Sequence, residues 1–66
     1  MKIKIIFEGK KRVVEYRKNM SIIELAKKNN IILPNYVVKI NGELVPEDEK
    51  IKENDKIEFI RITSGG

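Results

Sequence analysis

The sequence contains no cysteine and no histidine. These absences exclude disulfide bonds, thiolate nucleophiles, Cys/His zinc sites and the most common general base of enzymes. The chain also lacks any apolar run as long as a membrane span or the core of a signal peptide. We therefore expect a cytoplasmic protein that does not associate with membranes.

What remains suits one small domain. A chain of 66 residues buries only about 60% of its unfolded surface, which leaves no room for an elaborate catalytic cleft beside a core. The net charge is +4, from 14 basic and 10 acidic residues of interspersed sign. The only basic triplet is Lys10-Lys11-Arg12, and Glu47-Asp48-Glu49 is its acidic counterpart.

The first two predicted elements form a hairpin. Residues 2–8 alternate apolar and polar side chains, which predicts a half-buried strand with Ile3, Ile5 and Phe7 on its inner face. After a glycine-containing turn, residues 12–17 are predicted to return as the second strand.

A helix follows, with clear signals at both ends. Ser21 and Glu24 have the S-x-x-E spacing of a capping box, in which each side chain satisfies the other residue's free N–H. Met20 and Leu25 have the spacing of a hydrophobic staple. Asn29-Asn30 is the predicted end of the helix.

A second hairpin and a last strand complete the pattern. Residues 36–40 are rich in β-formers, and Asn41-Gly42 after them is a strong hairpin signal because a type I′ turn needs positive φ at both central residues. The chain returns over residues 43–45. Residues 56–62 form the last strand, after a charged connection in which Ile51 is the expected buried residue.

This order of elements predicts an α+β fold of the β-grasp (ubiquitin-like) type. A mixed sheet of four to five strands would pack on one α-helix, with the first and last strands parallel neighbours at its centre. We assign residues 1–62 to this domain and residues 63–66 to a flexible C-terminal tail.

The tail ends in Gly65-Gly66. A carboxylate on an extended segment without side chains can enter a narrow enzyme channel, where ATP can activate it as an acyl adenylate for attack by sulfur or nitrogen. The alternative is an ordinary frayed terminus.

Several segments resemble small sulfur-carrier and ubiquitin-like proteins. Residues 38–46 match their hydrophobic-x-hydrophobic-(N/D)-G-x-x-V-P segment, and residues 54–57 resemble the G-D-x-hydrophobic turn before their last strand. Asn54 stands where the family usually has Gly, and because Asn tolerates the left-handed conformation we expect the turn to be kept. The chain is similar to the archaeal small modifier proteins, to the thiamine-pathway sulfur carrier ThiS and, more distantly, to MoaD, the small subunit of molybdopterin synthase.

The resemblance implies a protein that is not itself an enzyme and binds no cofactor. An E1-like enzyme, using its own ATP and Mg²⁺, would adenylate the Gly66 carboxylate, and Gly65 would allow access to that enzyme's channel. The activated carboxyl would then become a thiocarboxylate for sulfur transfer (tRNA thiolation, thiamine or molybdopterin pathways) or be conjugated to target-protein lysines. The short length and the Val45-Pro46-Glu47-Asp48 segment favour the archaeal modifier type, with the thiamine-type carrier second.

A partner surface is also predicted. If Ile3, Ile5 and Phe7 face the helix, Ile6 faces outward, and by the same alternation so do Ile60 and Ile62 in the last strand. A contiguous apolar patch of this kind often marks an interface. We place Lys39 at its edge and Arg61 at the start of the tail, where Arg61 would pair with acidic residues of an activating enzyme or simply be solvated. The alternative is that Arg61 or long Lys side chains cover this face.

Two other classes of function stay open. A non-covalent β-grasp binding module for protein or RNA agrees with a pI of about 9.5. However, only Tyr16 and Tyr36 are expected to be exposed for stacking, and the basic residues are scattered. Autonomous catalysis by the acidic triplet is disfavoured because carboxylates on exposed loops are normally solvated. We therefore expect no direct nucleic-acid binding. A monomer is the default expectation for a protein of the type that it resembles.

Overall fold

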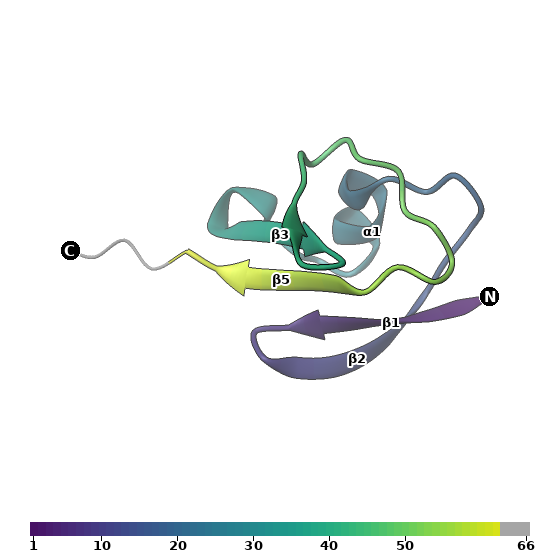
Figure 1. Ribbon diagram of the computed structural model, residues 1–66, viewed down its shortest axis with the longest axis horizontal. Helices are drawn as coiled ribbons and strands as arrows, with labels where there is room; N and C mark the ends of the chain where they lie inside the picture. The colour runs from purple at the N-terminus through teal and green to yellow at the C-terminus, as the bar shows by residue number, and fades with distance from the viewer. Residues whose placement is uncertain (63–66) are drawn as a thin grey trace.

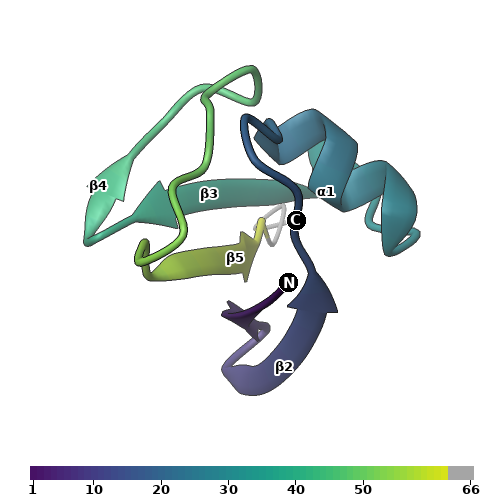
Figure 2. The ribbon, with the colours of Figure 1, turned by 90° about the vertical axis from the view of Figure 1, so that its right-hand side faces the viewer.

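The computed structural model describes residues 1–62. A five-stranded mixed sheet packs against one α-helix (Figure 1, Figure 2). In chain order the elements are β1 (Lys2–Phe7), β2 (Lys10–Glu15), α1 (Ile22–Lys28), the short 3₁₀ helix η1 (Leu33–Asn35), β3 (Tyr36–Ile40), β4 (Glu43–Leu44) and β5 (Ile57–Arg61).

The strand order is β2-β1-β5-β3-β4. β1 and β5 are parallel neighbours in the middle, and the other neighbouring strands are antiparallel. This arrangement confirms the predicted α+β, β-grasp fold. Within residues 1–62, no helix has the length and apolar character needed to cross a membrane.

The first hairpin turns more tightly than predicted. Glu8 and Gly9 have φ values of 50° and 80°, the signs that a two-residue type I′ turn requires. Two turn residues suffice, so pairing begins with Lys10 opposite Phe7. The prediction that this strand covers residues 12–17 was therefore wrong at both ends. Glu rarely adopts positive φ, and no local signal marked the shorter turn.

The second hairpin has the predicted turn. Asn41 and Gly42 have φ values of 53° and 85°. The Asn41 side chain also joins this turn to the loop before β5, because its Nδ2 donates to Asp55 Oδ1 at 3.1 Å and its Oδ1 accepts the Lys56 N–H at 3.0 Å.

Asp55, and not Asn54, holds the turn before β5. The Asp55 carboxylate accepts the Lys52 N–H at 2.9 Å, and the Asp55 N–H donates to the Lys52 carbonyl at 3.1 Å. Asn54 does not have positive φ. The predicted turn is therefore present, and a side chain to backbone hydrogen bond from Asp55 closes it without a left-handed residue at position 54.

α1 begins at the predicted capping box. Ser21 Oγ accepts the Glu24 N–H and the Glu24 carboxylate accepts the Ser21 N–H, both at 3.3 Å. The N–H groups of residues 22–23 are too close to the helix start for helical partners. They donate instead to the carbonyls of Glu49 and Glu47, at 3.0 Å each. The acidic triplet thus caps the helix through its backbone while its side chains stay exposed.

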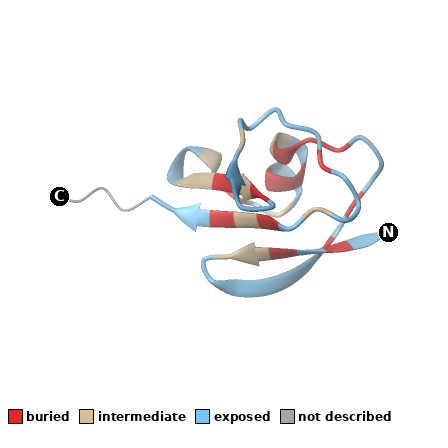
Figure 3. Cartoon of the chain, viewed as in Figure 1, coloured by how far each residue is buried: buried red, intermediate tan, exposed pale blue. Residues whose placement is uncertain are grey.

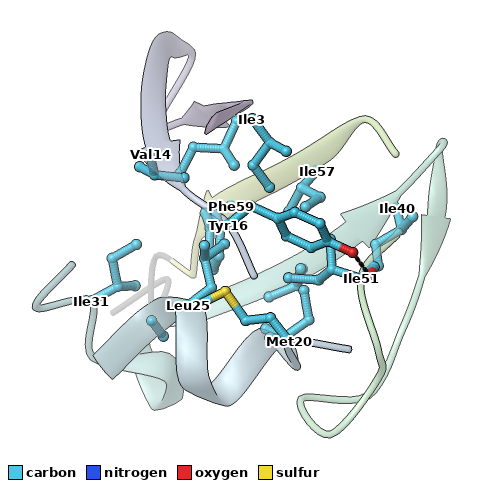
Figure 4. Close-up of a cluster of buried hydrophobic side chains, with 14 residues drawn as sticks. Ile3, Val14, Tyr16, Met20, Leu25, Ile31, Ile40, Ile51, Ile57 and Phe59 are labelled. Atoms are coloured by element: carbon cyan, nitrogen blue, oxygen red, sulfur yellow. Dashed lines mark hydrogen bonds between the residues drawn. The ribbon is translucent and has the colours of Figure 1, made fainter. Parts of the chain in front are cut away.

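The core lies between α1 and the inner face of the sheet (Figure 3, Figure 4). Phe59, on the central strand β5, is fully buried, and Ile51 fills the position predicted for it with 2% of its surface exposed. Tyr16 is also buried, so its predicted exposure was wrong. Its hydroxyl donates to the Ile51 carbonyl at 2.7 Å (Figure 4), which satisfies the polar tip while the ring packs in the core. The other buried apolar side chains are those of Ile3, Ile5, Val14, Met20, Ile22, Leu25, Ala26, Ile31, Val38, Ile40 and Ile57.

Candidate functional site

The described chain leaves the sheet at the end of its central strand. β5 ends at Arg61, and the next N–H, that of Ile62, donates to the Asn35 carbonyl at 2.9 Å. β1 is parallel to β5, so both strands finish at the same end of the sheet (Figure 1). The predicted carboxyl site at Gly66, its access residue Gly65 and the rest of the proposed tail lie outside the described residues.

Ile6 and Ile60 lie on the face of the sheet that points away from α1. Phe59 is buried against the helix side, so the alternation of the strand turns Ile60 outward, where 38% of its surface is exposed. Ile6 is half-buried and pairs with Glu58, which makes it a diagonal neighbour of Ile60. Ile62, one residue beyond β5, is also exposed.

Two residues of β3 complete this face. Val37 pairs with Ile60 and is half-buried, so Ile6, Val37 and Ile60 form what we call the outer apolar cluster. Lys39 pairs with Glu58 and borders the cluster. Val37 was not predicted as part of this surface; the alternation of the strand turns it outward because the neighbouring Val38 is buried. Glu58, on the central strand between Ile6 and Lys39, also lies on this face, so the cluster is apolar with charged neighbours, and its role as a partner surface stays a prediction.

Arg61 does not join this cluster. It pairs with Tyr36 and shares the strand alternation of Phe59, which places it on the helix side of the sheet at its end. Its Nη1 lies 3.9 Å from Glu8 Oε2, and its side chain is 60% exposed. Arg61 therefore already has an acidic neighbour within the chain.

Glu8 is the centre of a small polar and aromatic group at this end of the sheet. Its carboxylate accepts a 2.7 Å hydrogen bond from the Tyr36 hydroxyl. The same carboxylate forms a long ion pair with Arg61. The Tyr36 ring packs on Phe7, with ring centroids 5.1 Å apart, and meets Phe59 edge to face at 6.4 Å. The ends of β1 and β5 and the start of β3 are thereby held together.

The hydrogen bond to Glu8 is the main reason that the pKa of Tyr36 is raised. The Tyr36 hydroxyl donates this bond only when it is protonated, and desolvation and the negative charge of Glu8 also disfavour the phenolate. The positive charge of Arg61 acts in the opposite direction. Tyr36 is therefore a structural hydrogen-bond donor at ordinary pH.

In residues 1–62 no three Asp or Glu side chains come together in a group that could hold a metal ion. Glu47, Asp48 and Glu49 are exposed on their loop, as predicted.

Comparisons with known proteins agree with this geometry. Residues 4–66 match the family model described as the ThiS family. Among solved structures, the chain is similar to the thiamine biosynthesis protein ThiS from Geobacter metallireducens, with a TM-score of 0.68 and 22% sequence identity over 97% of this chain and 100% of that chain. The structural likeness supports the fold, and the family match covers nearly the whole sequence. The chain belongs to the ThiS family.

Proposed function

We propose that this protein is a sulfur carrier that holds sulfur on the carboxyl group of Gly66. The observation that carries the proposal is the family match, which runs through Gly66 and so includes the Gly65-Gly66 pair. The chain has no cysteine, so it has no thiol on which sulfur could be carried. Among the carboxyl groups of the chain, the one on Gly66 lies within the segment that the family match covers, and it can accept sulfur once it is activated.

The proposed chemistry begins with adenylation. A carboxylate is a poor electrophile, so an E1-like partner joins it to the α-phosphate of ATP and releases pyrophosphate. A persulfide of the sulfur source then attacks the acyl carbon and displaces AMP, which forms an acyl disulfide. A thiol reductant cleaves the S–S bond and leaves the thiocarboxylate on Gly66.

The folded body of the protein would be the part that the partner enzymes bind. The outer apolar cluster and the exposed Ile62 lie at or near the edge where the described chain leaves β5. An activating enzyme that binds this face would hold the carboxyl end close to its nucleotide. Binding energy from the body would then position the reacting group.

The thiamine pathway is the favoured destination of the sulfur. Our sequence reasoning placed the archaeal modifier type first and the thiamine-type carrier second, and the match to the ThiS family favours the second. We therefore propose the enzyme that builds the thiazole ring as the acceptor.

Intact-mass analysis tests this function. The protein is incubated with ATP, Mg²⁺, the activating enzyme of its host, a persulfide source and a thiol reductant. We expect a mass increase equal to the exchange of one oxygen for sulfur, and no increase for the protein lacking Gly66. An unchanged mass with an enzyme that activates its other substrates would contradict the proposal. Glycyl-glycine remnants on lysines of cellular proteins, without a thiocarboxylate, would instead identify a modifier.

A further inference from the structure

The basic triplet Lys10-Lys11-Arg12 lies at the end of the sheet where the parallel strands β1 and β5 finish. It begins β2, directly after the turn that follows β1. β1 is parallel to β5, and the Glu8 N–H donates to the Phe59 carbonyl at 3.1 Å. The turn therefore sits beside the last residues of the central strand (Figure 1).

The charges of the triplet are not neutralised within the described chain. Residues 1–62 contain two ion pairs, one between the N-terminal amine and Glu15 and one between Arg61 and Glu8. Glu8, the acidic residue closest in sequence to the triplet, is thus already engaged by Arg61 and Tyr36. All three cations of the triplet are exposed.

The triplet also borders a hollow in the surface. Phe7, Glu8, Lys10, Lys11 and Arg12 line this hollow of about 440 Å³. The Arg12 guanidinium lies over the Phe7 ring, 5.2 Å from its centroid, a cation–π contact that restrains the side chain. The tight turn restrains the backbone. Lys10 and Arg12 are thus presented from a fixed hairpin on the face that carries the Phe7 ring, and Lys11, which pairs with Ile6, points to the outer face of the same turn.

Charges on an edge strand commonly protect it from pairing with other chains. That role accounts for lysines on β2, which is an edge strand, but it requires neither the hollow nor the restrained Arg12. Nucleic acid is a weaker fit, since Arg12 covers one side of the Phe7 ring, Tyr36 packs on Phe7 and Tyr16 is buried. No described aromatic ring at this turn is therefore free to stack on bases.

We propose that the basic turn, Lys10-Lys11-Arg12, docks on an acidic surface of the adenylating enzyme beside the entrance of the channel that takes the carboxyl end. This inference rests on the proposed function. The acidic surface would lie next to that entrance because the basic turn lies next to the end of β5. Attraction between exposed charges mainly speeds encounter and sets orientation. The basic turn therefore lowers the KM for this protein and leaves the chemical step unchanged.

The test is ATP–pyrophosphate exchange by the host's adenylating enzyme at varied concentrations of this protein. The K10Q/K11Q/R12Q variant is expected to raise KM roughly tenfold at low ionic strength, to leave kcat unchanged, and to lose much of the salt dependence of KM. The matched control, K50Q/K52Q/K56Q, removes three exposed cations from the loop before the opposite end of β5 and is expected to keep the wild-type KM. Arg12→Lys, which keeps the charge, is expected to change KM less than Arg12→Gln.

Each other outcome has a definite meaning. Equal KM values for the two triple variants would overturn the docking surface. A variant that aggregates while its monomeric fraction keeps the wild-type KM would assign the triplet to edge protection. A loss of oligonucleotide binding with an unchanged KM would assign it to nucleic acid. Failure of the wild-type protein to support exchange would contradict the proposed function itself, and this result is visible without any variant.

Discussion

The Tyr36 hydroxyl donates a 2.7 Å hydrogen bond to the Glu8 carboxylate, which joins the start of β3 to the turn after β1. β5 lies between these two strands, and its last residue, Arg61, approaches the same carboxylate oxygen. Glu8 thus connects three strands at the end of the sheet where β5 finishes.

The Glu8 contact predicts a particular dependence on pH. The raised pKa of Tyr36 comes first from the hydrogen bond to Glu8, so Glu8→Gln should lower that pKa toward its usual value. A pKa that is higher in the folded state means that the neutral phenol stabilises the fold. This contribution is complete below the ordinary tyrosine pKa of about 10 and is lost as the pH rises through the folded-state pKa of Tyr36. NMR titration of tyrosine labelled at Cζ resolves Tyr36 from Tyr16, and an unshifted Tyr36 in the wild-type protein would refute the contact.

Gly42→Ala should destabilise the protein through the backbone alone. Gly42 has a φ of 85°, and a Cβ built there meets no atom within 4 Å. The left-handed conformation then accounts for the whole cost, which we expect to be about 1 kcal/mol. Urea unfolding measures it. Glu43→Ala, at an exposed neighbouring position, serves as the control with a change below about 0.5 kcal/mol. Equal midpoints for the two variants would count against a strained turn.

Gly65→Val should abolish activation without affecting the fold. A β-branched side chain blocks a narrow channel and excludes backbone angles open to glycine. The described sheet and core are complete within residues 1–62, so the melting temperature should match that of the wild type. ATP–pyrophosphate exchange and thermal unfolding provide the two measurements, with Thr63→Val as the control that retains activity. Full activity of the Gly65 variant would rule out a confined channel.

Ile60→Ser should weaken binding of the activating enzyme. Ile60 is 38% exposed at the centre of the outer apolar cluster, and we expect the loss of about 1 kcal/mol of binding energy, or roughly a fivefold increase in KM. Leu44→Ser, on the edge strand β4 with 67% exposure, is the matched control and should leave KM unchanged. If the Leu44 variant were the weaker substrate, the partner surface would lie nearer β4 than we propose.

Local signals predicted most of the fold. The capping box at Ser21, the Asn41-Gly42 turn and the alternation in the first strand are each encoded within a few residues, so they could be recognised without the structure. Tyr16 could not be placed in this way. Its burial depends on a hydrogen bond to Ile51, 35 positions away in sequence.

The candidate site was predictable to a lesser extent. Alternation correctly placed Ile60 on the outer face, because period two is a property of any strand. The separation of Arg61 from that face and its approach to Glu8 depend on strand order and register. Those are tertiary properties, and the positive φ of Glu8 had no counterpart in residue preference.

The central position of β5 has a consequence for biosynthesis. The ribosome makes this strand after the four others, yet it pairs with both β1 and β3 and so separates the two hairpins. Until β5 has emerged, the nascent chain consists of two hairpins with no strand between them, and contacts of such long sequence separation form slowly. Completion of the sheet is therefore a late event in synthesis, and an incomplete chain that lacks β5 would not present a folded body to an activating enzyme.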